Sequence, residues 1–134
     1  MTQRLRPTSH RLRRGLSYDP YEHAEHLGID VIHRSIRHAN GMWLPDHNLI
    51  VLRSGMRRMH DRSTLAHEIA HAMLGHGDDR PKHEKAADAF AGELLIHPGE
   101  CEAAMRHAHN VHELAVELQV ATRILSDWLE RRAA

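Results

Sequence analysis

The sequence predicts a single α+β domain that is mainly helical, with a small three-stranded antiparallel sheet in its first half. Three observations indicate this class. Short runs rich in β-branched residues stand between residues 29 and 53, apolar residues then recur at helical spacing, and no internal repeat or low-complexity linker divides the chain. We therefore expect one domain over residues 18–134, preceded by a basic flexible arm over residues 1–17.

A short helix is expected to open the domain at residues 20–27. Asp19 is a suitable N-cap residue, and Pro20 follows it at the first helical position, where proline is favoured. Gly28 is expected to end this helix.

Three short segments favour strands because β-branched and aliphatic residues dominate them. They are residues 29–34, 41–44 and 48–53. The turn residues Pro45-Asp46-His47 stand between the second and third segments. This order of strands and turn predicts the small antiparallel sheet.

From about residue 61 the apolar residues follow a helical period. Leu65, Ile69 and Met73 stand four residues apart, so they should form the buried side of a second helix. Gly75 is expected to break that helix.

The rest of the chain is expected to be helical. A third helix should begin at Pro81, and a short helix should follow over residues 100–109. Asn110 with Glu113 three residues later resembles a capping box, which opens another helix. The chain should therefore end in a pair of helices, broken near Gln119.

The composition excludes several classes of function. The 18 Lys and Arg residues are balanced by 18 Asp and Glu residues, which excludes a uniformly basic nucleic-acid wrapper, so nucleic-acid binding should be weak. The lone Cys101 can form neither an internal disulfide nor a thiolate metal cage. The longest aliphatic run, residues 49–52, is too short to span a bilayer. These features favour a cytoplasmic protein without membrane contact.

The segment His67-Glu68-Ile69-Ala70-His71 fits the metal-binding pattern HExxH. On a helix, residues four apart differ by about 40°, so both imidazoles project from one face and can bind one ion. Glu68 lies about 100° from His67, where its carboxylate could take a proton from a water that the ion activates. Because 15 histidines make a chance match easier, the pattern needs a second motif in support.

Glu84 is the best downstream candidate for a third ligand. It opens a segment in which Glu84 and Asp88 share one face of the third helix, with small alanines between them that allow close packing. Asp88 could then accept the N–H of a ligand histidine and fix its tautomer. His76 should point away from the site, because it lies about 140° around the helix from His71 if the helix continues.

The two motifs together resemble those of a known family. HEIAH followed by ExxAD is similar to the gluzincin arrangement of thermolysin-like peptidases, and the strings LAHEIAHAMLGHG and EKAADAFAGELLIHP resemble the ImmA/IrrE family of metallopeptidases. The resemblance runs from about Tyr21 to about Leu129. It implies a zincin-like metallopeptidase domain, an endopeptidase of bacteria or their mobile elements that cleaves a helix-turn-helix transcriptional repressor.

The resemblance also implies roles for individual residues. His67, His71 and Glu84 match the family's metal ligands. Glu68 matches its general base, and Asp88 matches the acid that supports a ligand histidine. The expected cofactor is Zn²⁺, although Mn²⁺ or Fe²⁺ could use the same His2Glu ligands.

Less specific interpretations of these residues stay open. Glu84 could be a solvated acid that the helix dipole favours, and Asp88 could form a surface ion pair with Lys85 or Arg80. The chain also departs from the family pattern at Ala121, where a Ser commonly caps the last helix.

The C-terminal helix pair offers an alternative function. It resembles a helix-turn-helix fragment, but Arg123 is the one basic residue near the start of its second helix, so a core-packing hairpin is the simpler interpretation. The alternative is a non-catalytic metal-binding regulator that acts through DNA or protein binding by this pair and the basic arm. A structural metal site usually has four protein ligands, and only three can be named here, which favours catalysis.

Overall fold

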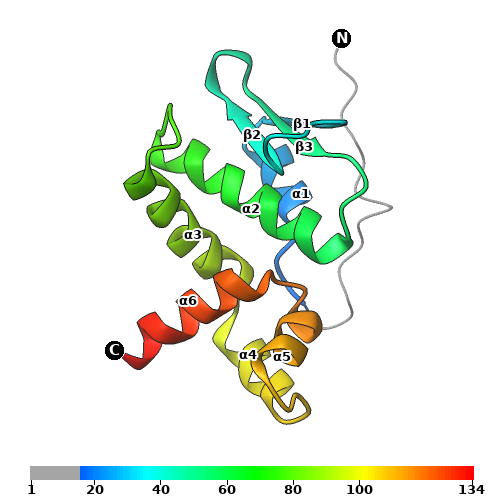
Figure 1. Ribbon diagram of the computed structural model, residues 1–134, viewed down its shortest axis with the longest axis vertical. Coiled ribbons are helices and arrows are strands. Elements are labelled where there is room, and N and C mark those ends of the chain that lie inside the picture. Colours follow the sequence, from blue (N-terminus) through cyan, green and yellow to red (C-terminus); the bar gives the residue numbers. More distant parts are fainter. Residues whose placement is uncertain (1–15) are drawn as a thin grey trace.

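The computed structural model describes residues 16–134, whose arrangement is shown in Figure 1. Residues 1–15 of the predicted basic arm lie outside this range, while Leu16 and Tyr18 pack, partly buried, against the core. Six α-helices and a three-stranded sheet make up the described part, in agreement with the predicted α+β class. None of the helices in residues 16–134 has the length and apolar character needed to cross a bilayer.

The strands β1 (Asp30–Arg34), β2 (Gly41–Leu44) and β3 (Leu49–Arg53) form a mixed sheet. β3 lies in the centre, antiparallel to β2 and parallel to β1. The prediction of an antiparallel sheet was wrong because the chain reverses twice between β1 and β3, and β3 then inserts between the two earlier strands. The continuous apolar run of β3, with three successive residues buried, suits this central position.

Two residues near the sheet, Asp19 and Asn48, adopt the local roles that their side chains favour. α1 (Pro20–His26) begins at Asp19, whose side chain accepts a hydrogen bond from the backbone N–H of Tyr21 at 2.9 Å. A 3-10 helix (Pro45–His47) joins β2 to β3 and ends at Asn48, which has a left-handed φ of 49°. Asn tolerates this conformation better than most residues, so the turn sequence suits the β2–β3 connection.

α2 (Arg58–Leu74) is the central element, because it lies between two apolar cores. Leu65 and Ile69 belong to the core that α2 shares with α1 and the sheet, whereas Ala66 belongs to the core formed with the later helices. Met73, which the spacing placed on the buried side, is 46% exposed. It lies in the final turn, beyond the buried stretch of the helix.

The other four helices pack beside and below α2 in Figure 1. They are α3 (Pro81–Leu95), α4 (Pro98–Met105), α5 (Val111–Leu118) and α6 (Thr122–Ala133). α3 packs on both α2 and α6. Gly92 stands where α3 contacts α6, since a Cβ at that position would touch the Trp128 ring at 3.4 Å, an ordinary van der Waals distance. α3 is thereby held between the central helix and the C-terminal helix.

Side-chain caps define the C-terminal helix pair. Asn110 Oδ1 accepts a hydrogen bond from Glu113 N–H at 2.9 Å, as the capping box predicts, while the Glu113 carboxylate accepts from His109 N–H. At the start of α6, Ala121 has no side chain that could cap the helix. Ser63 of α2 instead accepts a hydrogen bond from Ala121 N–H at 2.8 Å, so the two helices are joined directly.

Arg62 is a buried cation that joins α2 to the end of α5. Its Nη1 donates to the carbonyl oxygens of Leu118 and Gln119 at 3.1 and 2.8 Å, and its Nη2 donates to the carbonyl of Tyr18 at 2.9 Å. Carbonyls at a helix C-terminus have no partner within the helix, so Arg62 supplies one.

Arg62→Ala should lower the free energy of unfolding by about 3 kcal/mol, because three buried or partly buried carbonyls lose a charged donor at once. Urea unfolding monitored by circular dichroism measures the change. Arg131→Ala is the matched control, since it removes only an exposed ion pair and should cost about 0.5 kcal/mol or less. Equal destabilisation by the two variants would contradict the role given to Arg62.

Candidate metal centre

Three residues of the HExxH segment lie on the buried stretch of α2. His67, Glu68 and His71 are exposed by only 6%, 7% and 5%. The two imidazoles project from the same face, with ring centroids 4.7 Å apart. Because α2 packs against other elements on two sides, these side chains have a rigid support.

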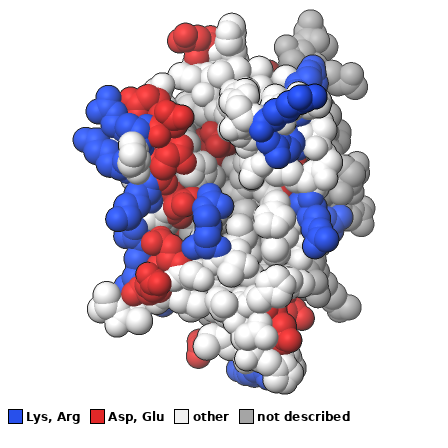
Figure 2. Space-filling model, viewed as in Figure 1, with Lys and Arg blue, Asp and Glu red and all other residues white. Residues whose placement is uncertain are grey.

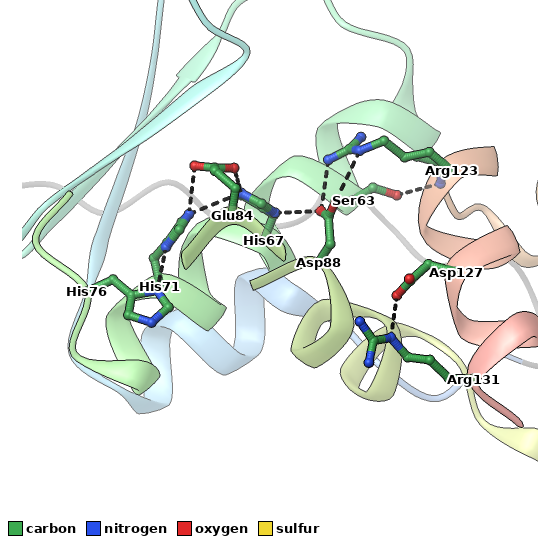
Figure 3. A network of polar contacts seen from close by, with 10 residues as sticks. Ser63, His67, His71, His76, Glu84, Asp88, Arg123, Asp127 and Arg131 are labelled. Atoms are coloured by element: carbon green, nitrogen blue, oxygen red, sulfur yellow. Dashed lines mark hydrogen bonds and ion pairs between the residues drawn. The ribbon is translucent and has the colours of Figure 1, made fainter. Parts of the chain in front are cut away.

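Glu84, in the first turn of α3, meets both histidines across the helix interface. Its Oε2 lies 2.8 Å from His67 Nε2, and its Oε1 lies 3.1 Å from His71 Nε2. The two Nε2 atoms are 3.1 Å apart. One ligand atom from each residue falls within 4.8 Å of the others, and no other group of His, Cys, Asp and Glu between residues 16 and 134 converges in this way (Figure 3).

This donor set fits a divalent ion such as zinc. Two imidazoles and one carboxylate are typical ligands of catalytic zinc, and three protein ligands leave a fourth position open. Both Nε2 atoms face Glu84, while both Nδ1 atoms turn outward to other side chains. Metal-binding histidines usually show this division between the two ring nitrogens.

Asp88 links the His67 imidazole to α6. Its Oδ1 lies 2.8 Å from His67 Nδ1, and Arg123 donates to its two oxygens from Nε at 3.3 Å and from Nη2 at 3.0 Å. Burial would raise the pKa of Asp88, but the hydrogen bond from His67 and the charge of Arg123 lower it. The cation that Asp88 contacts is therefore Arg123, not the Lys85 or Arg80 that the sequence left open.

Asp88→Asn should weaken zinc retention about 10- to 100-fold, because the asparagine has no negative charge with which to hold the Nδ1–H of His67. Competition with a chromogenic chelator measures the affinity. Asp127→Asn provides the control, since Asp127 pairs with Arg131 on α6 and does not touch the site. If both variants retain zinc equally well, Asp88 does not support the ligand.

The two histidines differ in their charge environment. Burial lowers the pKa of His67, but the hydrogen bond to Asp88 and the neighbouring carboxylates outweigh burial and raise it overall. Burial also lowers the pKa of His71, and the charge of His67 lowers it further. A neutral imidazole is the form that binds a metal, so His71 is favourably placed for that role.

His76 lies beside His71, contrary to the prediction that it points away. α2 ends at Leu74, and Gly75 adopts a left-handed φ of 72° that turns the chain back. The backbone N–H of His76 then donates to the carbonyl of His71, and its Nδ1 lies 2.9 Å from His71 Nδ1. The prediction assumed a continuing helix, and Gly75 was the signal in the sequence that the helix stops.

Glu68 is next to the donor cluster without belonging to it. Burial raises the pKa of Glu68 to about 7, against the opposing effects of His67 and of a hydrogen bond from the backbone N–H of Trp43. A buried carboxylate with this pKa is a stronger base than an ordinary glutamate. The structure thus places one buried carboxylate beside three converging donors.

A cleft of about 540 Å³ contains these residues. Residues 38–44 line one side of it, and the loop at residues 76–79 lines another. Gly41 permits the close approach of β2 to α2, because a Cβ there would lie 2.7 Å from Thr64 Cγ2 and 3.2 Å from Glu68 Cγ. Figure 2 shows side chains of both charge signs gathered over α3, so this side of the molecule carries no patch of a single sign.

β2 is an edge strand with part of its backbone directed away from the sheet. Arg53 N–H donates to the carbonyl of Asn40, and the alternation of an antiparallel ladder then directs the backbone groups of Gly41 and Trp43 away from β3. The hydrogen bond from Trp43 N–H to Glu68 agrees with this direction. An open strand edge can pair with an extended peptide through main-chain hydrogen bonds.

Two comparisons with known proteins bear on this site. The model of a peptidase family, the IrrE N-terminal-like domain, matches residues 24–127, a range that contains the whole donor cluster. The chain is also 38% identical over 68 residues to the radiation response metalloprotease IrrE of Deinococcus radiodurans. That match covers 51% of this chain and 20% of the relative, so the chain spans only a small part of the relative's length.

Proposed function

Because this chain belongs to the family of IrrE N-terminal-like domains, we propose that it is a metal-dependent endopeptidase. One observation carries the proposal: three converging donors and a separate buried carboxylate share one cleft. We further propose that residues 18–134 form a single catalytic domain, since both cores and the cleft are built within this range.

The proposed ion is zinc, held by Nε2 of His67, Nε2 of His71 and the carboxylate of Glu84. Mn²⁺ or Fe²⁺ could occupy the same donors. A bound ion of this kind supplies Lewis-acid polarisation of a carbonyl and lowers the pKa of a water. The chain contributes the geometry: Asp88 holds the ring of His67, and α3 presents Glu84 to α2.

Glu68 is the proposed general base. Its carboxylate takes a proton from the attacking water and then delivers it to the leaving amine. The backbone N–H of Trp43 orients the carboxylate, and the buried surroundings keep its basicity above that of an exposed glutamate. Glu68 therefore supports proton transfer without being needed as a ligand.

The proposed substrate is an extended segment of a protein partner. β2 could receive such a segment through the outward backbone groups of Gly41 and the carbonyl of Trp43, since the Trp43 N–H already binds Glu68. Main-chain pairing there would place a peptide bond beside the donor cluster. Following the family resemblance, we propose that the partner is a helix-turn-helix transcriptional repressor.

The helix-turn-helix alternative has less support. Apolar side chains of α5 and α6, such as Leu114, Ile124 and Trp128, are buried in the core, as a packing hairpin requires. Arg123, the basic residue expected to contact DNA, is bound to Asp88. Neither observation favours a DNA-binding role for this pair.

Co-expression with repressors encoded beside this protein tests the proposal. The wild-type protein should produce a shortened repressor, and a chelator should stop the same cleavage when both proteins are purified. If the metal-loaded protein relieves repression and no shortened repressor is found, the non-catalytic regulator becomes the better interpretation.

A further inference from the structure

His76 occupies the same relation to His71 that Asp88 has to His67. Each lies 2.8–2.9 Å from the Nδ1 atom of its histidine, on the side of the ring that faces away from Glu84. Asp88 comes from α3, whereas His76 comes from the turn that follows α2. A second side chain therefore contacts the Nδ1 atom of each converging imidazole, and Figure 3 shows both contacts.

The tautomers of the two rings decide which histidine donates the hydrogen bond between His71 and His76. A neutral imidazole carries one N–H, and His71 must keep Nε2 bare if that atom faces a metal. The proton of His71 then lies on Nδ1 and points at His76 Nδ1, 2.9 Å away. His76 is consequently the acceptor, with its own proton on Nε2.

The His76 ring is itself fixed by a second histidine. His83, in the first turn of α3, stacks on it with ring centroids 3.9 Å apart and an interplanar angle of 10°. His83 Nδ1 lies 2.7 Å from Asp78 Oδ1, and the same oxygen accepts a hydrogen bond from Arg80 N–H at 3.2 Å. The turn between the two helices that carry the donors thus holds the acceptor in place.

We propose that His76 is a positioning residue that accepts the Nδ1–H of His71 and so directs His71 Nε2 toward the site. This inference rests on the proposed metal centre. It gives the short turn after α2 a role in metal binding, although that turn supplies no ligand.

A direct ligand role for His76 does not fit the geometry. Its Nδ1 contacts Nδ1 of His71, on the opposite side of the ring from the Nε2 atom that meets Glu84. His76 is also outside the converging donor group found among residues 16–134. Three ligands and an open position remain, as an enzyme of this type requires.

The test measures zinc affinity by chelator competition in the 134-residue chain, with three variants. His76→Ala removes the acceptor and should weaken zinc binding about 10- to 100-fold. His76→Asn places an amide oxygen where Nδ1 stood, so it should restore most of the affinity. His109→Ala changes a histidine that is 86% exposed and contacts Glu113, and it should bind zinc as wild type does.

A second measurement separates positioning from a general effect on the fold. Nitrogen-15 NMR of the zinc-loaded protein should show His71 protonated at Nδ1 in the wild type and in His76→Asn, and thermal melting should show all variants folded. Equal zinc affinity of His76→Ala and wild type, or failure of His76→Asn to restore binding, would overturn the proposal. If the wild-type protein itself binds no zinc, the proposed function fails instead.

Discussion

A protein carrying Glu68→Gln should bind metal as the wild type does and fail to cut its partner. Glutamine has the size of glutamate, and its amide oxygen can still accept the hydrogen bond from Trp43, but it cannot take up a proton from water. General-base catalysis contributes about 10²- to 10⁴-fold. Since Glu68 is the only buried carboxylate among the described residues that line the cleft, cleavage should fall at least that far.

The rate at which shortened repressor appears measures this loss, and elemental analysis reports the metal content of the same samples. Glu93→Gln is a suitable control, because Glu93 is an exposed residue of α3 that does not line the cleft. Cleavage by Glu68→Gln at the wild-type rate would exclude Glu68 as the base. Loss of metal together with activity would instead place Glu68 among the ligands.

Glu84→Ala should deprive the protein of its metal. It removes the carboxylate that lies within 3.1 Å of both Nε2 atoms and leaves only two imidazoles to hold an ion. Loss of a residue that only hydrogen-bonds a metal ligand typically weakens metal affinity about 10- to 100-fold. Loss of a ligand itself should weaken metal affinity by more than that. Chelator competition and elemental analysis of the purified protein measure the effect.

The matched control for this prediction is Glu93→Ala, which removes an acid from the exposed surface of the same helix. It should leave metal content unchanged. Glu84 is partly exposed, with 43% of its side chain accessible, so Glu84→Ala should not unfold the protein. Full metal occupancy in folded Glu84→Ala would mean that Glu84 is the solvated acid of the less specific interpretation.

Local patterns predicted the elements of this site well. The four-residue spacing of His67 and His71 determines that both imidazoles share a helix face, whatever the rest of the chain does. Apolar periodicity likewise predicted the helices, and the cap residues predicted where several of them begin. Glu84 was identified because its motif stands at the start of the next helix, which a short turn brings back onto α2.

Contacts between distant segments could not be predicted in the same way. Arg123 is 35 positions from the Asp88 that it contacts, and Ser63 is 58 positions from the Ala121 that it caps. The spacing of residues along the chain does not indicate such pairs, because they depend on how whole helices pack. The parallel pairing of β1 with β3 was missed for the same reason, whereas His76 was misplaced because one left-handed glycine redirects the chain.

The shortness of β2 limits the kind of protein segment that the proposed reaction could use. Its four residues direct the backbone groups of only Gly41 and Trp43 away from the sheet. A net contribution of about 0.5–1.5 kcal/mol per hydrogen bond is small beside the 5–15 kcal/mol, roughly, that hold a folded domain together. In the proposed reaction such an edge would not unfold a partner, so it would capture a segment that is already open. Whether the partner segment is folded or open, more than its sequence, would then decide when the proposed cleavage occurs.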